Sequence, residues 1–335
     1  MSTTRARILG LGSYLPANRV TNEDLTKTIE TSHEWIVERS GIEERRWVSP
    51  EDGNYTMGVK AAKAALEDAG CEPGEIDCII YATLSPDYFF PGCGVLVQRE
   101  LGIGPVPAFD IRQQCSGFVY GLQMANAFVQ TGQYRKILLI GGEVHSRGLD
   151  KTTRGRTVSV LFGDGAGAAV IGASEDPDRG ILSTRMHSDG SDAESLAILW
   201  PGMAAGREHF VTHEDIDEAR IWPYMEGQKV FKSAVRRMPE VVREVLDDQG
   251  LAVSDLNMLI PHQANLRIIS ATAKKLNMDM DRVIVTVDKH GNTSAASVGL
   301  ALDEAIRSGQ VARGDVLLLE AFGGGFTWGS ALIKY

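Results

Sequence analysis

The chain has 335 residues and a formal net charge of −10, with 34 Lys and Arg against 44 Asp and Glu. Hydrophobic residues make up 43% and charged residues 23%, which is typical of a globular protein of about two domains. The acidic balance argues against a nucleic-acid partner, which needs a strong positive field. The N-terminal stretch lacks a signal-peptide pattern, and no run approaches ~18 apolar residues, so we expect a cytoplasmic protein without a membrane partner.

Short apolar runs rich in β-branched residues alternate with helical patterns, which favours α/β layers on buried, largely parallel sheets. The predicted strands are Ile8–Leu11, Cys78–Ala82, Ala108–Ile111, Ile137–Gly141, Ala168–Gly172, Ile181–Met186, Met258–Ile260, Val283–Val287, Val316–Glu320 and Gly329–Lys334. The predicted helices are 55–69, with Asn54 as a possible N-cap, 226–249, 264–276 and 295–308, and a further apolar helix follows Cys115.

The order of these elements is roughly the same in the two parts of the chain, so we predict two equivalent halves, 1–175 and 176–335. The boundary falls in 173–180, where Pro177 and Gly180 interrupt the pattern. The stretch 188–223 is long and irregular, and we interpret it as a functional loop or lid.

The four cysteines form no CxxC pair and no zinc spacing, so we expect reduced thiols and no metal site. They are Cys71, Cys78, Cys93 and Cys115. Only Cys115 lies between a predicted strand and a helix that is apolar nearly all round, and such a helix is buried. The free N–H groups at a helix start favour an anion, so we expect a nucleophilic thiol with a lowered pKa. Taken alone, a free cysteine is most often a small core residue.

Two polar stretches, "LIPHQANLRI" and "VDKHGNTSAA", also follow predicted strands. They contain His262 and Asn292. Taken alone, His262 reads equally well as a functional residue or as a solvated histidine at a helix start, and Asn292 reads as a turn residue or an N-cap. Together with Cys115 they give a nucleophile, an imidazole and an amide, each at the mouth of a strand. A cysteine protease has the same order of residue types, but the local C-G-[SA]-C-[WY] signature is absent and that alternative ranks low.

Three glycine-rich stretches differ in what their backbones can bind. "GLGSYL" does not match GxGxxG, and "FGDGAGAAV" is not closed by Lys-Ser/Thr, so neither predicts a nucleotide site. "AFGGGFTWG" follows a buried strand, and its backbone N–H groups could face an oxyanion.

Five stretches taken together resemble β-ketoacyl-acyl-carrier-protein synthase III, a family with the thiolase-like fold. They are "TSHEWIVERSGIEERRW", "FGDGAGAAV", "PHQANLRIISATAKKL", "HGNTSAAS" and "LEAFGGGFTWGSALIKY". The resemblance covers nearly the whole chain and is loosest over 191–226. It implies two pseudo-equivalent halves in a five-layer αβαβα arrangement, assembled as a homodimer.

The resemblance implies that acyl-CoA acylates Cys115, and that malonyl on acyl carrier protein then loses CO2 and attacks the thioester. This condensation initiates fatty acid synthesis. His262 and Asn292 would supply neutral donors to the enolate oxygen, and the N–H groups of Cys115 and Gly324 would hold the tetrahedral oxyanion. No cofactor is implied beyond the two thioester substrates. A thiolase would need a second Cys and an elongating synthase a second His, and the choice of Asn292 over His290 rests on the resemblance.

The resemblance also assigns binding residues. The adenine end of coenzyme A would lie against Trp35, Arg39 and Arg154. The pantetheine tunnel would be lined by Gly227, Phe231, Ala264 and Asn265. Phe90 would close the partner's acyl pocket across the dimer. An acidic carrier protein would dock on the basic residues Lys232, Arg267, Lys274 and Lys275, of which Arg267 and Lys274 share a helix face.

Two departures from the family pattern bear on the acyl donor. Gln113 and Gln114 stand where members that serve fatty acid synthesis often have small residues, and the stretch 191–226 is long. Both favour, as an alternative, a secondary-metabolite homologue with an unusual donor. An acyltransferase that does not decarboxylate and a non-catalytic carrier-binding subunit are further alternatives, although the last has no use for Cys115, His262 and Asn292 together.

Overall fold

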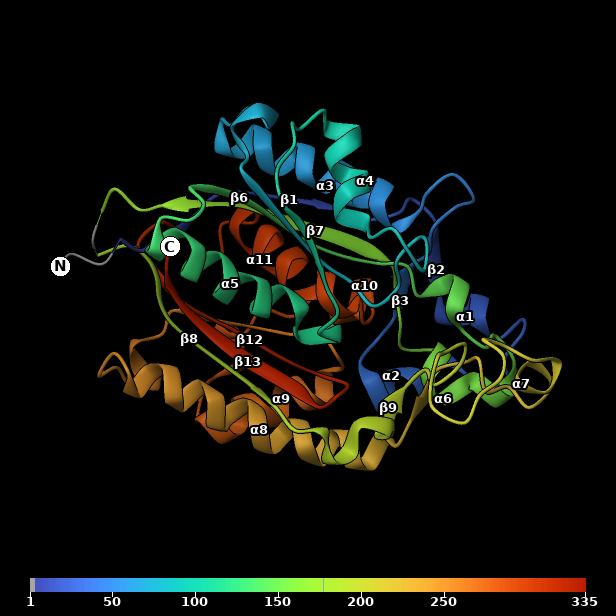
Figure 1. The fold of residues 1–335 in the computed structure, drawn as a ribbon. Helices are drawn as coiled ribbons and strands as arrows, with labels where there is room; N and C mark the ends of the chain where they lie inside the picture. The colour runs from blue at the N-terminus through green and yellow to red at the C-terminus, as the bar shows by residue number, and fades with distance from the viewer. Residues whose placement is uncertain (1–3, 177) are drawn as a thin grey trace.

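The computed structural model describes residues 4–176 and 178–335, and two mixed sheets form its framework (Figure 1). The first sheet has the strand order β1 (Ala6–Tyr14), β7 (Gly165–Ala173), β6 (Lys136–Glu143), β4 (Cys78–Ala82) and β5 (Ala108–Ile111). The second has the order β11 (Met258–Pro261), β12 (Val316–Gly323), β13 (Thr327–Lys334) and β8 (Gly180–Ser188).

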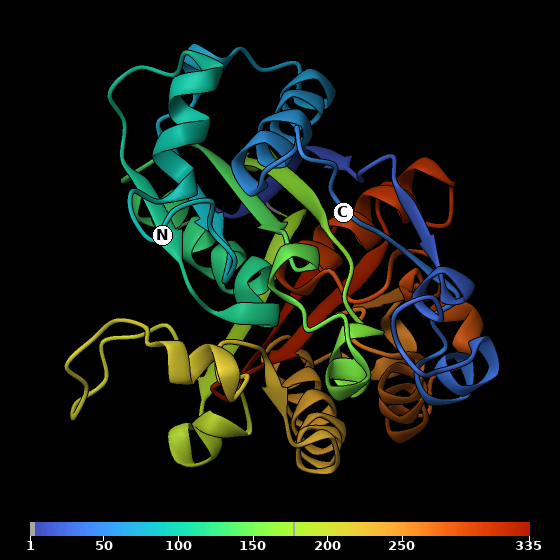
Figure 2. The ribbon, with the colours of Figure 1, turned by 90° about the vertical axis from the view of Figure 1, so that its right-hand side faces the viewer.

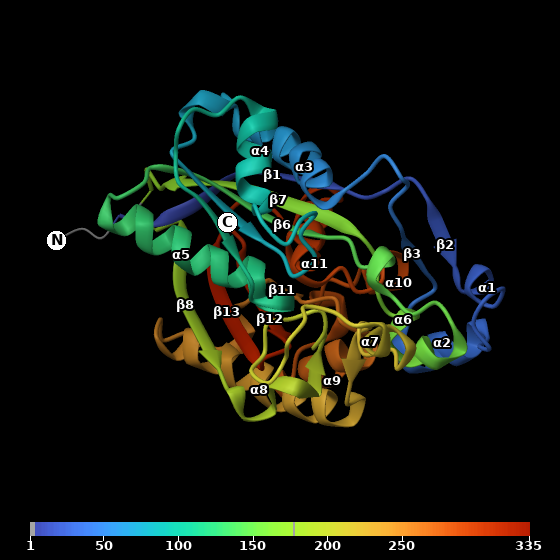
Figure 3. The same cartoon turned by 45° about the vertical axis from the view of Figure 1, so that its right-hand side comes forward.

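Helices cover both faces of each sheet. The outer face of the first sheet carries α3 (Asn54–Ala69) and α4 (Cys93–Leu101). The layer between the sheets holds α5 (Gly117–Thr131) and α11 (Ser297–Arg307), and α8 (Gly227–Asp247) and α9 (Leu266–Leu276) cover the second sheet from outside (Figures 1 and 3). The layers therefore alternate as αβαβα, which confirms the predicted arrangement.

Shorter elements gather at one end of the layers, at the right of Figure 1. They are β2 (Arg19–Thr21), α1 (Asn22–Leu25), α2 (His33–Ser40), β3 (Glu44–Arg46), α6 (Arg156–Ser159), β9 (Leu196–Ala197), α7 (His213–Asp217), β10 (Tyr224–Met225) and α10 (Val287–His290). β2 pairs with β3, and β9 pairs with β10. Seen from this end, the chain between β9 and β10, drawn in yellow, projects from the body (Figure 2).

The prediction of largely parallel sheets is wrong. β4 runs parallel to β5 and β6, and β11 runs parallel to β12, but the other neighbouring pairs of both sheets are antiparallel. Continuous apolar runs show that a strand is buried on both faces, and here helices bury antiparallel strands as completely as parallel ones. The pattern therefore predicts burial and does not give strand direction.

The two sheets repeat one topology. β1, β7, β6 and β4 correspond in order and pairing sense to β8, β13, β12 and β11. The fifth place of the second sheet holds only an isolated parallel bridge between Leu259 and Val283, so the predicted strand Val283–Val287 is wrong. The N–H groups of Thr286 and Val287 donate to the side-chain oxygen of Gln263 instead of to a neighbouring strand.

Four predicted helices are present as α3, α8, α9 and α11, but the N-cap of α3 is Gly53 rather than Asn54. The Asp87 carboxylate accepts the N–H groups of Asn54 and Tyr55, so it takes the place of a side-chain cap.

β7 ends at Ala173 and β8 begins at Gly180, on either side of the predicted boundary, while Pro177 lies outside the described residues. Among the described residues, we find no helix with the length and apolar character needed to span a bilayer.

The middle layer joins the two sheets through close packing of α5 on α11. Phe118 of α5 is completely buried, and a Cβ placed on Gly299 of α11 would lie 3.0 Å from its ring. A glycine at that position therefore allows the two helices to approach. Cys115 lies two residues before α5, so this packing also sets the depth of the thiol in the protein.

We predict that Phe118→Ala lowers the free energy of unfolding by about 3–5 kcal/mol, because it leaves a cavity between the two sheets. Met280→Ala is the control, since Met280 is 39% exposed and the same kind of truncation there should change stability by less than ~0.5 kcal/mol. Chemical denaturation followed by circular dichroism measures both. Equal effects of the two substitutions would contradict the packing described for the middle layer.

Candidate active site

A cavity of about 390 Å³ leads from the surface to Cys115, His262 and Asn292. Its lining includes the exposed Lys232 and Arg267, whereas those three residues are only 6%, 2% and 6% exposed. The structure therefore brings the predicted nucleophile, imidazole and amide together at the buried part of one cavity.

Cys115 lies in a 3-10 turn, Gln114–Ser116, between β5 and α5. Gln114 has a φ of 45°, in the left-handed region that side chains rarely adopt, so this turn is strained. A Cβ on Gly323, at the end of β12, would lie 2.9 Å from the Cys115 nitrogen. The first glycine of "GGG" is therefore required for the second sheet to reach the nucleophile, and Gly324 follows it, also buried.

The expectation of a lowered pKa at Cys115 is wrong, because burial raises the pKa of this thiol to about 12. The Ser294 hydroxyl donates to Sγ at 3.4 Å, which favours the thiolate but does not compensate for the lost solvent. The nearby Glu143 raises the pKa further, and the 3-10 turn separates the sulfur from the first turn of α5. The thiol is therefore neutral at pH 7 in the chain without substrate.

His262 follows β11 and is fixed at both its backbone and its ring. Its N–H donates to the Glu320 carbonyl at 2.7 Å, and Nδ1 lies 2.6 Å from the Ser297 hydroxyl. That hydroxyl also accepts the N–H of Gln263 at 3.4 Å, and among the described residues Nδ1 is the acceptor within reach of its hydrogen. We therefore assign the hydroxyl hydrogen to Nδ1, which leaves the ring hydrogen on Nε2. Burial, with a smaller effect of His145, lowers the pKa of His262 to about 3, so the imidazole is neutral at pH 7.

Asn292 is held at its backbone and at one end of its amide. Its N–H donates to the Leu161 carbonyl at 2.8 Å, and its carbonyl accepts the Gly163 N–H at 3.0 Å. Oδ1 accepts the Ser294 N–H at 2.9 Å, so the amide NH2 is the end that remains to donate into the cavity. His290, the other candidate in this stretch, lies 2.9 Å from Glu304 through Nε2.

Known proteins match this chain along nearly its whole length. Residues 109–190 match the family model "3-Oxoacyl-[acyl-carrier-protein (ACP)] synthase III", and residues 246–335 match the model of its C-terminal part. The β-ketoacyl-[acyl-carrier-protein] synthase III of Alkalilimnicola ehrlichii is 51% identical over 333 residues, which cover 98% of this chain and 99% of that protein. The chain belongs to this family.

Solved structures agree with the fold. The 3-oxoacyl-[acyl-carrier-protein] synthase III of Aquifex aeolicus superposes with a TM-score of 0.89 at 45% identity, over 99% of this chain and all of that one. The priming β-ketosynthase of the R1128 polyketide pathway gives 0.88 at 36% identity, over 98% of this chain and 96% of that one. The predicted thiolase-like fold of a synthase III is therefore confirmed.

Six of the seven coenzyme A residues predicted for a synthase III line the cavity: Trp35, Arg39, Gly227, Phe231, Ala264 and Asn265. Asn265 also caps α9, since its side chain accepts the N–H groups of Arg267 and Ile268. The Arg154 guanidinium instead pairs with Asp150 at 2.6 Å.

Arg156, which no sequence argument singles out, lies 4.6 Å from the centre of the Trp35 ring. The Arg39 guanidinium lies 4.4 Å from the same ring. Two guanidinium groups therefore make cation–π contacts with the Trp35 ring.

The four residues predicted to dock a carrier protein are exposed but lie at two places along the surface. Lys232 and Arg267 line the mouth of the cavity. Lys274 and Lys275 are in the last turn of α9, about 10 Å further along the helix axis. The basic surface therefore begins at the mouth and continues along α9.

Phe90 is 82% exposed and does not line the cavity within the described chain. The neighbouring Phe89 packs edge-on against Phe210, whose segment projects between β9 and β10, with ring centres 5.2 Å apart. That segment is ordered by Arg207, which contacts the Trp200 ring at 3.7 Å and the Asp215 carboxylate at 2.5 Å. The interpretation of this segment as a functional loop or lid stays a prediction.

Two serines that orient the site, Ser294 and Ser297, have no distinctive sequence signal, because serine is ordinary at a helix start. The same holds for several apolar residues of the cavity wall. These are Phe162, Leu196, Met225 and Phe322. They come from segments that are far apart in the chain, so only the fold identifies them.

We predict that alkylation of Cys115 by iodoacetamide accelerates about tenfold per pH unit from pH 7 to 10, without a plateau, because the thiolate fraction keeps rising below a pKa of about 12. Peptide mass spectrometry measures the rate at this cysteine. Cys115→Ser is the control, because it retains the other three buried thiols. A plateau between pH 7 and 8 would show that the thiol is already ionised there.

Proposed function

We propose that this chain acts as a β-ketoacyl-acyl-carrier-protein synthase III, which forms a β-ketoacyl product and initiates fatty acid synthesis. The observation that carries the proposal is that Cys115, His262 and Asn292 meet in one cavity of a chain 51% identical to such a synthase. The reaction has two steps, acylation of the thiol and a decarboxylating condensation.

In the first step Cys115 attacks the carbonyl carbon of acyl-CoA. The new C–S bond forms as the bond to coenzyme A breaks, and the thiol proton of Cys115 leaves with coenzyme A as its thiol. The N–H groups of Cys115 and Gly324 are the proposed donors to the tetrahedral oxyanion. The Ser294 hydroxyl favours developing negative charge on the sulfur, because it already donates to Sγ.

In the second step the malonyl group on acyl carrier protein loses CO2, and the electrons of the broken C–C bond form an enolate. The Nε2–H of His262 and the amide NH2 of Asn292 donate to its oxygen, and removal of such a donor typically costs ~10²–10³-fold in rate. The enolate carbon attacks the Cys115 thioester, and the sulfur leaves as a thiolate that takes up one proton from solvent. No strong base is needed, since departure of CO2 supplies the electron pair.

The neutral state of His262 suits this step. A positively charged imidazole would form an ion pair with the malonyl carboxylate and stabilise the group that must leave. With its pKa lowered to about 3, His262 offers a hydrogen bond without attracting the carboxylate. Both donors of the site therefore act on charge that appears only after the C–C bond begins to break.

The proposed assembly is a homodimer in which Phe90 closes the acyl pocket of the partner. The exposed side chains of Tyr88, Phe89 and Phe90, together with Phe109 on the edge strand β5, support it, because a second chain would cover this apolar surface. The proposed location is the cytoplasm, where free thiols stay reduced.

In the proposed organisation, the half 1–175 carries the nucleophile, and the half 176–335 carries His262 and Asn292. The secondary-metabolite alternative is favoured by Gln113 and Gln114 beside the nucleophile. It would change the acyl donor and the pathway but leave both steps as described.

We predict that incubation with a panel of acyl-CoAs adds one acyl group to the chain, and that intact-mass measurement identifies the preferred donor from the mass gained. Cys115→Ala should gain no mass, because the nucleophile is absent. The acylated chain should then release CO2 from malonyl-acyl carrier protein. Equal labelling of the Ala variant would refute the nucleophile, and acylation without CO2 release would instead favour the acyltransferase that does not decarboxylate.

We predict that Lys274→Glu together with Lys275→Glu raises KM for malonyl-acyl carrier protein about tenfold at low salt, since it reverses charge on the proposed docking surface. The rate of acylation by acyl-CoA should not change, because neither lysine lines the cavity. Lys63→Glu, an exposed lysine on α3 in the opposite outer layer, is the control. A similar rise of KM in the control would indicate an effect of net charge alone.

A further inference from the structure

We propose that Arg45 is a positioning residue for the decarboxylation step: it holds the loop 160–164, and that loop holds Asn292. The inference rests on the proposed function, because it assumes that the Asn292 amide donates to the enolate. It concerns a side chain outside the cavity wall, in the three-residue strand β3, which lies far before Asn292 in the chain.

Arg45 is completely buried, and the acceptors that its guanidinium contacts are neutral. One terminal nitrogen donates to the Val20 carbonyl at 3.3 Å and to Asn22 Oδ1 at 2.9 Å, and the other donates to the Val160 carbonyl at 2.8 Å. Burial lowers the pKa of Arg45 to about 10, which still leaves it charged at pH 7. A buried charge with neutral partners is costly, and an apolar side chain would fill the space at lower cost, so its presence calls for a role in specifying local structure.

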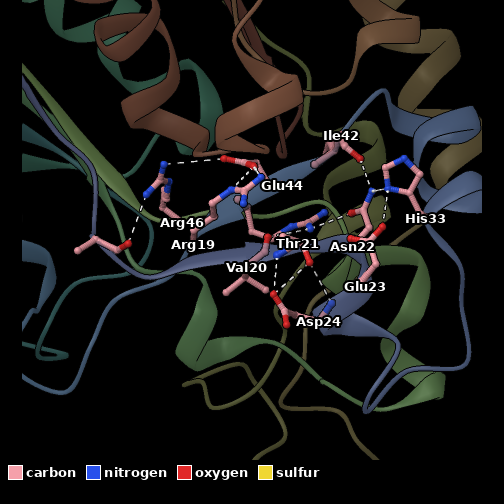
Figure 4. A network of polar contacts seen from close by, with 12 residues as sticks. Arg19, Val20, Thr21, Asn22, Glu23, Asp24, His33, Ile42, Glu44 and Arg46 are labelled. Atoms are coloured by element: carbon pink, nitrogen blue, oxygen red, sulfur yellow. Dashed lines mark hydrogen bonds and ion pairs between the residues drawn. The ribbon is translucent and has the colours of Figure 1, made fainter.

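Asn22, which Arg45 contacts on the side away from the loop 160–164, is held by further hydrogen bonds. Asn22 donates through its amide to the Ile42 carbonyl at 2.7 Å, and the same amide nitrogen lies 3.4 Å from the His33 ring (Figure 4). Thr21 and Asp24 fix the start of α1 by a reciprocal capping pair (Figure 4). The guanidinium therefore connects the loop 160–164 to a support that is held independently of the cavity.

Several backbone groups of the loop 160–164 are bonded to β3 or to the adjacent Trp47 on one side and to Asn292 on the other. From the β3 side, Arg45 holds the Val160 carbonyl, the indole N–H of Trp47 donates to the Phe162 carbonyl at 3.1 Å, and the Asp164 N–H donates to the Arg46 carbonyl at 2.8 Å. From the other side, Asn292 bonds the Leu161 carbonyl and the Gly163 N–H. The loop is thus a layer between β3 and Asn292.

Packing supports the same connection. A Cβ on Gly163 would lie 3.3 Å from the Arg45 Cβ, and one on Gly291 would lie 3.1 Å from it. Gly291 has a φ of 64° and directly precedes Asn292, so its conformation sets the direction in which the asparagine side chain leaves the backbone. The Arg45 side chain therefore packs close to both chain segments that meet in the Phe162–Asn292 bridge.

Cys115 depends on other contacts. The residues that fix it are Gly323 of β12 and Ser294 in the 3-10 turn before α11, and neither bonds to Arg45 or to the loop 160–164 in the described part of the chain. Ser294 does donate its N–H to Asn292 Oδ1, but its hydroxyl reaches Cys115 directly. Loss of the Arg45 contacts should therefore impair the step that uses Asn292 much more than acylation of the thiol. This separation of the two steps distinguishes positioning from general destabilisation.

The test measures the two steps separately in Arg45→Met, in Asn292→Ala and in the double variant. Acylation is followed by intact mass, and CO2 release from malonyl-acyl carrier protein is followed with labelled substrate after acylation is complete. We expect acylation within about threefold of the unsubstituted chain and CO2 release lowered about 10²-fold, as in Asn292→Ala. The double variant should release CO2 no more slowly than Asn292→Ala alone, because both substitutions remove the same donor.

Arg46→Met is the matched control, because Arg46 is the next residue, is partly exposed, and contributes its carbonyl rather than its side chain to the loop. It should change neither step. If Arg45→Met does not fold, Trp47→Phe removes one bond to the same loop and should show a smaller decrease in CO2 release alone.

Three results would overturn the proposal: an equal fall of both steps, an unchanged rate of CO2 release, or effects that multiply in the double variant. Failure of the unsubstituted chain to release CO2 after acylation would instead refute the proposed function. The two failures are therefore distinguishable in one set of measurements.

Discussion

The exclusion of water from around Cys115 decides the protonation state of the groups in the site. Burial disfavours whichever form carries a charge, so it raises the pKa of the Cys115 thiol to about 12 and lowers that of the His262 imidazole to about 3. Nucleophile and imidazole are consequently both neutral before substrate binds. On Cys115 and His262 themselves, charge appears only with the reaction, and it then interacts with fixed donors in a medium where such interactions are strong.

Neutral groups must be oriented by hydrogen bonds, and the 3-10 turn Ser294–Ala296 together with Ser297, the first residue of α11, supplies one to each side chain of the site. Ser294 donates its hydroxyl to Cys115 and its N–H to Asn292, and Ser297 contacts the ring of His262. One short turn therefore contacts all three residues proposed for catalysis. Because α11 lies between the two sheets and against α5, the precision of the site depends on the packing of the middle layer.

Much of this arrangement can be predicted from the sequence, because local residue patterns determine where helices and buried strands form. Buried strands such as Cys78–Ala82 and helices such as α9 follow from apolar periodicity and end residues, and the thiolase-like fold follows from motifs spread over the chain. Strand direction did not follow, since two-sided burial gives the same apolar run in parallel and antiparallel strands.

The remaining features depend on contacts between distant segments. The pKa of Cys115 was mispredicted because the number of residues that enclose a sulfur is a property of the fold. Neither Arg156 nor Arg45 has a distinctive sequence signal. Arg156 follows Arg154 by two residues and Arg45 lies in a short polar strand, and in both settings an arginine is expected to be an exposed charge. Only the coordinates show that one of them is completely buried.

The site that results presents two hydrogen-bond donors, His262 and Asn292, and no cation at its depth. An inhibitor with a neutral carbonyl or sulfonyl oxygen could satisfy both donors at once. A carboxylate in the same place would give up its hydration shell without gaining an ion partner. Selective compounds against this cavity should therefore keep any negative charge for the mouth, beside Lys232 and Arg267, and remain uncharged where they meet the imidazole and the amide.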